Sequence, residues 1–258
     1  MSFRRFVAMG DSTTEGVGDA DGNGGLRGWA DRLATRLAAV DDGVLYANIA
    51  VRGRLTRQIH LEQLDHALDL RPDLVSLLVG MNDLLRPAFD LDNVAEDIES
   101  MTEALRTQDA TVLLFTLPDP ARVMAIARPL GGRFRALSAE VRMIAARTGA
   151  RVIDLEAHAV AGDPRLWSED RLHANPEGHR RIAEAAAHVL GVPGASDAWT
   201  EPLDASPARR LGERLRTELD WARRSFAPWI GRRLRGRSSG DGITAKRPTL
   251  EPVLPVRG

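Results

Sequence analysis

The chain has 258 residues and contains no cysteine. This absence excludes disulfides and zinc sites built on thiolates, and it leaves the redox compartment unconstrained. No apolar run reaches the roughly 18 residues that a membrane-spanning helix needs, and the first residues contain no apolar run of signal-peptide length. We therefore expect a soluble, cytoplasmic protein.

Aromatic residues are also few, at 5% of the chain, but the hydrophobic share of 43% is enough for one full core. The net charge of −1 conceals an asymmetry. From Glu201 to the end there are thirteen basic and seven acidic residues, so the first 200 residues are acidic as a whole. An acidic body followed by a basic tail indicates two parts with different uses.

Short apolar segments alternate with helical patterns through the first 190 residues. The apolar segments have the length and flanking turns of strands, and the third is almost continuously apolar, as a strand covered on both faces must be. The predicted strands are 6–9, 45–49, 74–79, 111–115 and 151–155, and the predicted helices are 29–40, 58–70, 92–107, 133–148 and 177–190. This alternation predicts a five-stranded parallel sheet with helices on both faces.

The remainder of the chain differs in composition. We expect a main domain over 1–192, a linker over 193–207, a basic amphipathic helix over 208–236 and a flexible tail over 237–258, which is rich in Ser, Gly and Pro. The helix could pack its narrow apolar stripe on the acidic body, make weak contact with an anionic membrane surface, or bind nucleic acid or a protein partner. Packing is favoured, and nucleic-acid binding is not expected.

Polar residues stand at the ends of several predicted strands. Ser12, Gly53 and Asn82 follow the first three strands, and Asp170 and His173 lie in the loop before the last helix. A parallel sheet brings the carboxyl ends of its strands to one edge, so these residues can meet there.

Acyl transfer by a serine needs residues of these types. The hydroxyl of Ser12 needs a base, which His173 can supply, and Asp170 can fix the tautomer of that histidine. The developing oxyanion needs donors, and the N–H groups of Ser12 and Gly53 and the side-chain amide of Asn82 can provide them.

Four sequence blocks resemble those of the SGNH (GDSL-type) hydrolase superfamily of serine esterases and lipases. The resemblance covers roughly residues 5–190 and implies a flavodoxin-like three-layer α/β/α fold. It implies esterase, lipase or deacetylase activity on a small-molecule or lipid ester, with no metal or other cofactor. It also implies that Ser12 is the nucleophile, His173 the base and Asp170 its partner, with Gly53 and Asn82 as oxyanion donors. The blocks are Gly10-Asp11-Ser12, Gly53, Gly80-Met81-Asn82-Asp83 and Asp170-Arg171-Leu172-His173.

The first block departs from the family name at Thr13, where a leucine would stand. We expect this difference to alter packing behind the nucleophile and to leave the chemistry intact. Asp11 and Asp83 border the site, and we expect them to support it by bonding the N–H groups of turns and orienting their neighbours.

Other interpretations of the same residues remain open. Asp11 and Ser12 could simply cap the following helix. Asp170 and His173 could bind a metal together with Asp11 or Asp154. His179, six residues beyond His173, is a rival base.

A different class of function is also open, in which the hydrolase domain is vestigial and the chain binds partners through the basic helix. The complete set of five site residues argues against it. Trp29, Phe89, Met124 and Trp167 fall in loops near the expected pocket mouth and are candidates to line an acyl site. The sequence sets neither the natural substrate nor the oligomeric state.

Overall fold

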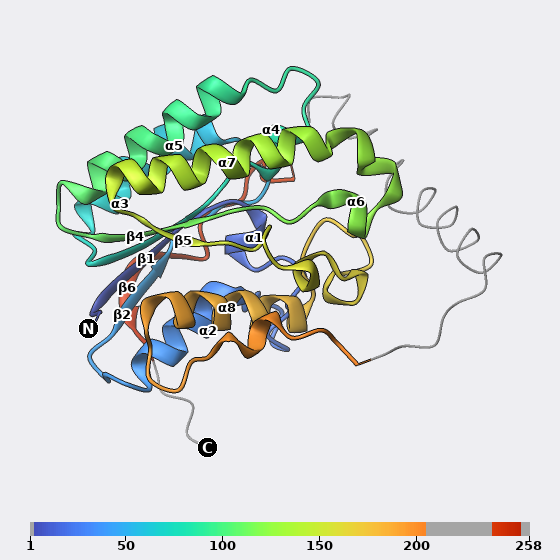
Figure 1. The fold of residues 1–258 in the computed structure, drawn as a ribbon. Helices are drawn as coiled ribbons and strands as arrows, with labels where there is room; N and C mark the ends of the chain where they lie inside the picture. The colour runs from blue at the N-terminus through green and yellow to red at the C-terminus, as the bar shows by residue number, and fades with distance from the viewer. Residues whose placement is uncertain (1–2, 205–238, 254–258) are drawn as a thin grey trace.

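The computed structural model describes residues 3–204 and 239–253 and shows a sheet held between two layers of helices (Figure 1). The sheet has six strands in the order β5-β4-β3-β1-β2-β6. The first five strands pair in parallel, as predicted. The strands are β1 (Arg5–Gly10), β2 (Leu45–Asn48), β3 (Leu74–Leu78), β4 (Thr111–Phe115), β5 (Arg151–Ile153) and β6 (Arg247–Pro252).

Helices cover both faces of the sheet. In Figure 1, α2 (Gly28–Ala38) and α8 (Pro176–Leu190) lie below it, and α3 (Thr56–Asp69), α5 (Leu91–Arg106) and α7 (Gly131–Thr148) lie above it. Short helices follow three strand ends, and 3-10 turns occupy the later loops. These are α1 (Ser12–Glu15), α4 (Met81–Leu84), α6 (Pro120–Val123), η1 (Ala125–Leu130), η2 (Ala159–Gly162), η3 (Pro164–Leu166) and η4 (Asp197–Thr200). The predicted three-layer α/β/α architecture is confirmed.

The hydrophobic pattern explains these layers. Every residue of β3 is buried, because helices cover both of its faces. On α5 the buried apolar residues are Val94, Ile98, Met101 and Leu105, which recur every three or four positions and form one helix face. The apolar face of each helix therefore packs on the sheet, and its polar face remains in solvent.

The strand order determines where a site can form. The parallel strands run 2-1-3-4-5, which is the flavodoxin-like order, and the connections reverse direction on either side of β1. Open α/β sheets bind ligands at such a reversal, beyond the carboxyl ends of the strands. Here that position is the end of β1, where Ser12 begins α1.

The predicted flexible tail over 237–258 is wrong for residues 239–253. These residues are ordered, and β6 adds an antiparallel sixth strand to the edge of the sheet beside β2. Lys246 anchors the segment, since its ammonium donates to the carbonyls of Leu26 and Arg27 at 3.0 and 2.8 Å and pairs with Asp31. Two prolines in β6 concealed it in the sequence, but an edge strand tolerates proline because one side of it needs no N–H donor.

The predicted linker over 193–207 is also wrong where the structure describes it, up to residue 204. Trp199 of η4 is buried, and its ring lies 4.6 Å from the ring of His158. Arg181 of α8 donates to the carbonyls of Trp199 and Glu201 at 2.9 and 2.6 Å. The segment therefore packs on the main domain.

The predicted basic helix over 208–236 lies outside the described residues. Within 3–204 and 239–253, none of the helices combines the length and the apolar character needed to cross a membrane.

Candidate active site

The turn after β1 presents Ser12 at the start of α1. Asp11 is the N-cap of this short helix, and its carboxylate accepts a hydrogen bond from the N–H of Thr13 at 3.1 Å. The preceding Gly10 is held by the buried side chain of Gln63, whose amide accepts from Gly10 N–H and donates to Gly10 C=O, both at 2.9 Å. The capping interpretation is thus correct for Asp11, and it leaves the hydroxyl of Ser12 available to bind His173.

Ser12, His173 and Asp170 form one continuous chain of hydrogen bonds. Ser12 Oγ lies 2.9 Å from His173 Nε2, and His173 Nδ1 lies 2.6 Å from Asp170 Oδ2. A carboxylate at Nδ1 keeps the proton on that nitrogen, which leaves Nε2 as the acceptor for the serine proton. The sequence prediction that these three residues meet is consistent with this geometry.

The loop before α8 fixes Asp170. Its Oδ1 accepts from Ser168 Oγ and from the N–H groups of Leu172 and His173, at 2.9, 2.9 and 3.1 Å. Burial by itself would raise the pKa of Asp170. The hydrogen bond and positive charge of His173, together with the two N–H donors, outweigh burial and hold this pKa well below its ordinary value. Asp170 is therefore ionised and can stabilise a histidine cation.

Asn82 approaches the same turn from the start of α4. Its Nδ2 donates to Asp11 Oδ2 at 2.9 Å and to the carbonyl of Arg54 at 3.1 Å. Because both partners are acceptors, they fix the orientation of the amide, with Nδ2 facing Asp11 and Arg54. The carboxylate of Asp11 thus connects the turn that carries Ser12 with the residue predicted to donate to the oxyanion.

Asp11 has an unusual electrostatic environment. It is 1% exposed, and burial raises its pKa to about 6. The N–H of Thr13, the charge of His173 and the amide of Asn82 lower this pKa, whereas the nearby charge of Asp83 raises it. Asp11 therefore changes protonation in the range where many enzymes work.

An ion pair holds the loop that carries Gly53. Gly53 has φ +77° and precedes α3. The neighbouring Arg52 donates its backbone N–H to Glu15 at 2.8 Å, and its guanidinium also binds this carboxylate. Glu15 belongs to α1, so the pair connects the helix that begins at Ser12 with the Gly53 loop.

Asp83 has the supporting position that the sequence predicted for it. Its Oδ2 accepts from the N–H and the hydroxyl of Thr56, the first residue of α3, at 3.0 and 2.9 Å. Burial raises the pKa of Asp83, and these two hydrogen bonds lower it. Asp83 thereby connects the start of α3 with α4.

His179 does not fit the role of rival base. It is fully buried, its Nδ1 accepts from the N–H of Trp29 at 3.1 Å, and its Nε2 donates to the carbonyl of Val17 at 3.0 Å. Burial lowers its pKa to about 4. Both ring nitrogens therefore serve to connect α8 with α2 and the loop before it.

The metal interpretation also lacks geometric support. The carboxylate of Asp154 binds Arg142 and the hydroxyl of Thr116. Among the residues that the structure describes, no three or more His, Asp or Glu side chains gather closely enough to hold a metal ion.

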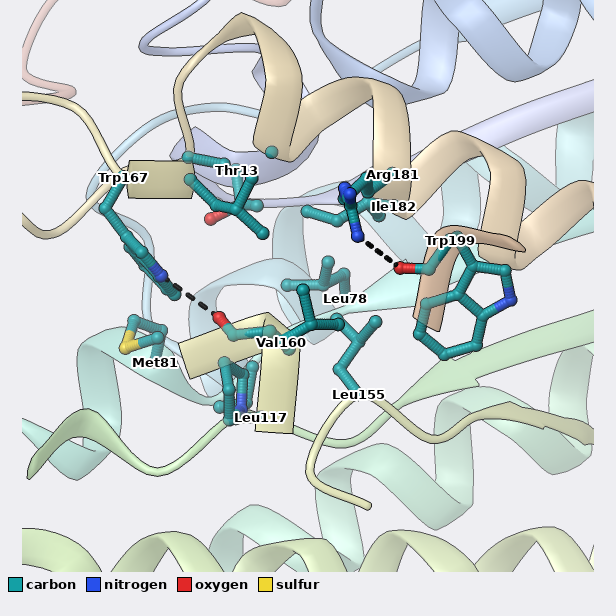
Figure 2. A pocket seen from close by; sticks show the side chains of 15 residues that line it. Thr13, Leu78, Met81, Leu117, Leu155, Val160, Trp167, Arg181, Ile182 and Trp199 are labelled. Atoms are coloured by element: carbon teal, nitrogen blue, oxygen red, sulfur yellow. Dashed lines mark hydrogen bonds between the residues drawn. The ribbon is translucent and has the colours of Figure 1, made fainter. Parts of the chain in front are cut away.

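An apolar cavity of about 50 Å³ adjoins the site (Figure 2). Its lining comes from α8, from the ends of β3, β4 and β5, and from the loops around η2, η3 and η4. Thr13, Met81 and Ala174 line it, and each follows or precedes a predicted site residue in the chain. The apolar lining includes Leu78, Leu117, Leu155, Val160, Leu166 and Ile182.

Of the aromatic residues expected near the pocket mouth, one lines the cavity and another lies in the core. Trp167 does line this cavity, and its Nε1 donates to the carbonyl of Ala161 at 3.0 Å. Trp29 does not lie at a pocket mouth, because it belongs to α2 and packs its fully buried ring 4.9 Å from that of Phe115. Gln63, the Glu15–Arg52 pair and Trp199 were missed, since no local motif marks them.

Comparison with known proteins agrees with this geometry. The model of the GDSL-like Lipase/Acylhydrolase family matches residues 8–181. No curated protein matches the chain.

Solved structures resemble the fold. Axe2, an acetylxylan esterase from Geobacillus stearothermophilus, is 20% identical with a TM-score of 0.63, covering 78% of this chain and 97% of that one. TesA is 22% identical with a TM-score of 0.61, covering 72% and 97%. LAE5, an alpha/beta hydrolase enzyme from the metagenome of Lake Arreo, Spain, is 24% identical with a TM-score of 0.58, covering 74% and 96%. At these identities the likeness shows the fold.

Proposed function

Because the chain belongs to the GDSL-like lipase/acylhydrolase family and is an ester hydrolase of the SGNH type, we propose that it cleaves carboxylic esters through an acyl-enzyme on Ser12. The observation that carries the proposal is the hydrogen-bonded chain from Ser12 Oγ through His173 to Asp170. The small ester substrates that the family implies fit a site whose nucleophile is only 9% exposed.

The reaction begins when Ser12 Oγ attacks the ester carbonyl carbon and its proton passes to His173 Nε2. Asp170 stabilises the resulting imidazolium. As the tetrahedral intermediate collapses, the bond to the alcohol oxygen breaks and His173 returns the proton to that oxygen. A water molecule then attacks the acyl-enzyme, with His173 again as base, and the acid leaves with Ser12 restored.

The oxyanion is stabilised by the N–H groups of Ser12 and Gly53 and by the amide of Asn82. Ser12 is the first residue of α1, and N–H groups in the first turn of a helix have no partner inside it. Nδ2 of Asn82 contacts Arg54 C=O at 3.1 Å and Asp11 at 2.9 Å. We expect the longer contact, to Arg54, to be exchanged for the oxyanion while Asp11 keeps the amide in place.

Hydrolysis of p-nitrophenyl esters tests the proposal. Ser12→Ala and His173→Ala should each lower kcat by at least about 10⁴-fold, because each removes part of one proton-transfer unit. Ser100→Ala and the exposed His188→Ala are matched controls and should keep wild-type turnover. If Ser12→Ala retains turnover, the proposed mechanism is wrong.

A further inference from the structure

The apolar cavity beside the site is closed at its far end by a part of the chain beyond the family-matched residues 8–181. Thr13, Met81 and Trp167 stand at one side of the cavity in Figure 2, and Trp199 stands at the other. Thr13 and Met81 are chain neighbours of Ser12 and Asn82, and consecutive Cα atoms are about 3.8 Å apart. Ser12 and Asn82 do not themselves line the cavity, but these neighbours do, so one side of it lies close to the reacting centre, and Trp199 lines the opposite side.

Trp199 is fixed in this position. It is 7% exposed, and its ring packs edge-on against His158 at 4.6 Å. Its carbonyl accepts from Arg181 at 2.9 Å, which fastens η4 to α8. Because these contacts hold Trp199 in place, the indole sets a fixed end to the cavity.

From this geometry we infer that the cavity is the acyl-chain subsite and that Trp199 sets the longest acyl chain the enzyme accepts. The inference rests on the proposed function and specifies its substrate class as esters of short, unbranched fatty acids. Most of the lining is apolar, and its one charged member, Arg181, already donates to the carbonyls of Trp199 and Glu201. The cavity therefore suits methylene groups and disfavours hydroxylated acids.

The volume of the cavity sets the length of the acyl chain that it can hold. A water molecule needs about 10–15 Å³ on the same measure, so a cavity of about 50 Å³ holds roughly three to five groups of that size. Butyrate and hexanoate esters fit this space, and decanoate esters exceed it. Each methylene that leaves water should raise kcat/KM about fourfold, so hexanoate should exceed acetate by on the order of 100-fold.

The test compares p-nitrophenyl esters from acetate to decanoate on the wild type, Trp199→Ala and Val160→Phe. Removing the indole should raise the decanoate-to-hexanoate ratio of kcat/KM at least about tenfold, because the cavity lengthens. Phenylalanine at position 160, on the cavity lining, should lower the hexanoate-to-acetate ratio at least about tenfold. Because each ratio compares two esters on the same variant, it reports chain-length preference even if the variant loses overall activity. Trp199→Phe keeps a smaller aromatic ring at the far end of the cavity and should raise the decanoate-to-hexanoate ratio less than Trp199→Ala does. The exposed Leu61→Ala is the control and should keep the wild-type ratio.

Ester turnover that depends on Ser12, with the same chain-length profile in all variants, would overturn the inference while leaving the proposed function standing. Binding of hexanoate, measured by calorimetry, tests the cavity without turnover. Wild-type protein should bind it, and Val160→Phe should bind it at least about tenfold more weakly. Equal binding by both proteins, or no binding by the wild type, contradicts the inference. Loss of the Ser12 dependence would instead count against the proposed mechanism.

Discussion

Replacing Asp11 by asparagine removes a buried carboxyl whose titration should control stability. Asp11 is 1% exposed, and burial raises its pKa from 3.8 to about 6. The folded protein therefore holds the proton more tightly than the unfolded chain. The stabilisation from this group is fully present below pH 3.8, and it is lost as the pH rises through 6.

The shift sets the size of the effect. About two pKa units correspond to roughly 3 kcal/mol, of which about 1.4 kcal/mol disappears between pH 5 and pH 8. Asp11→Asn keeps an acceptor for the N–H of Thr13 but cannot titrate. The wild-type free energy of unfolding should therefore fall relative to that of Asp11→Asn as the pH rises from 5 to 8.

Urea unfolding of both proteins at several pH values measures this difference. The exposed Asp69→Asn is the matched control and should follow the wild type at every pH. If the difference in unfolding free energy between wild type and Asp11→Asn stays constant from pH 5 to 8, Asp11 is ionised throughout this range and its pKa is not raised to about 6.

The same substitution should affect catalysis. When the single amide oxygen of an asparagine at position 11 accepts from Thr13 N–H, its NH₂ faces Nδ2 of Asn82, which in the wild type donates to Asp11 at 2.9 Å. The donor amide then loses the acceptor that orients it. We expect kcat to fall by up to about 10²–10³-fold, the cost of one misplaced oxyanion donor, with little change in KM.

Three further substitutions test other parts of the site. Asn82→Ala should lower kcat by about 10²–10³-fold in steady-state ester hydrolysis, and a loss confined to KM would contradict its role at the oxyanion. Glu15→Gln weakens the pair with Arg52 and should lower kcat about 5–30-fold; a lower melting temperature with unchanged kcat would make the pair purely structural. At Gly240 a Cβ would lie 2.0 Å from the carbonyl of Arg52, so Gly240→Ala should destabilise the fold by about 1–3 kcal/mol and lower kcat. Gly132→Ala, where a Cβ meets nothing within 4 Å, should do neither in thermal melts and kinetics.

The elements with strong periodic signals were predicted correctly from the sequence. The almost continuous apolar run of β3 fits only a strand covered on both faces, and the apolar positions of α5 fit only a helix with one buried face. The alternation of such strands and helices then determines the parallel sheet. The polar residues at the strand ends also converge as the topology requires. Ser12, His173 and Asp170 are within hydrogen-bond distance of one another in turn.

The features that the sequence did not predict depend on contacts between distant residues. The strand β6 contains two prolines and little apolar surface, and it is ordered by pairing with β2 and by the anchor at Lys246. The ring of Trp199 packs against His158, and the carbonyl of Trp199 accepts from Arg181 of α8. Both partners lie far from Trp199 in the chain. Gln63 contacts Gly10 across 53 positions, and no motif at either residue signals this pairing.

Trapping the acyl-enzyme shows whether Ser12 is the nucleophile. The protein is mixed with p-nitrophenyl butyrate, quenched in acid during turnover, digested and analysed by mass spectrometry. We expect a butyryl adduct on the peptide that contains Ser12, and no adduct in Ser12→Ala. Steady turnover with no adduct at Ser12, or an adduct on another residue that Ser12→Ala leaves in place, would contradict this role of Ser12.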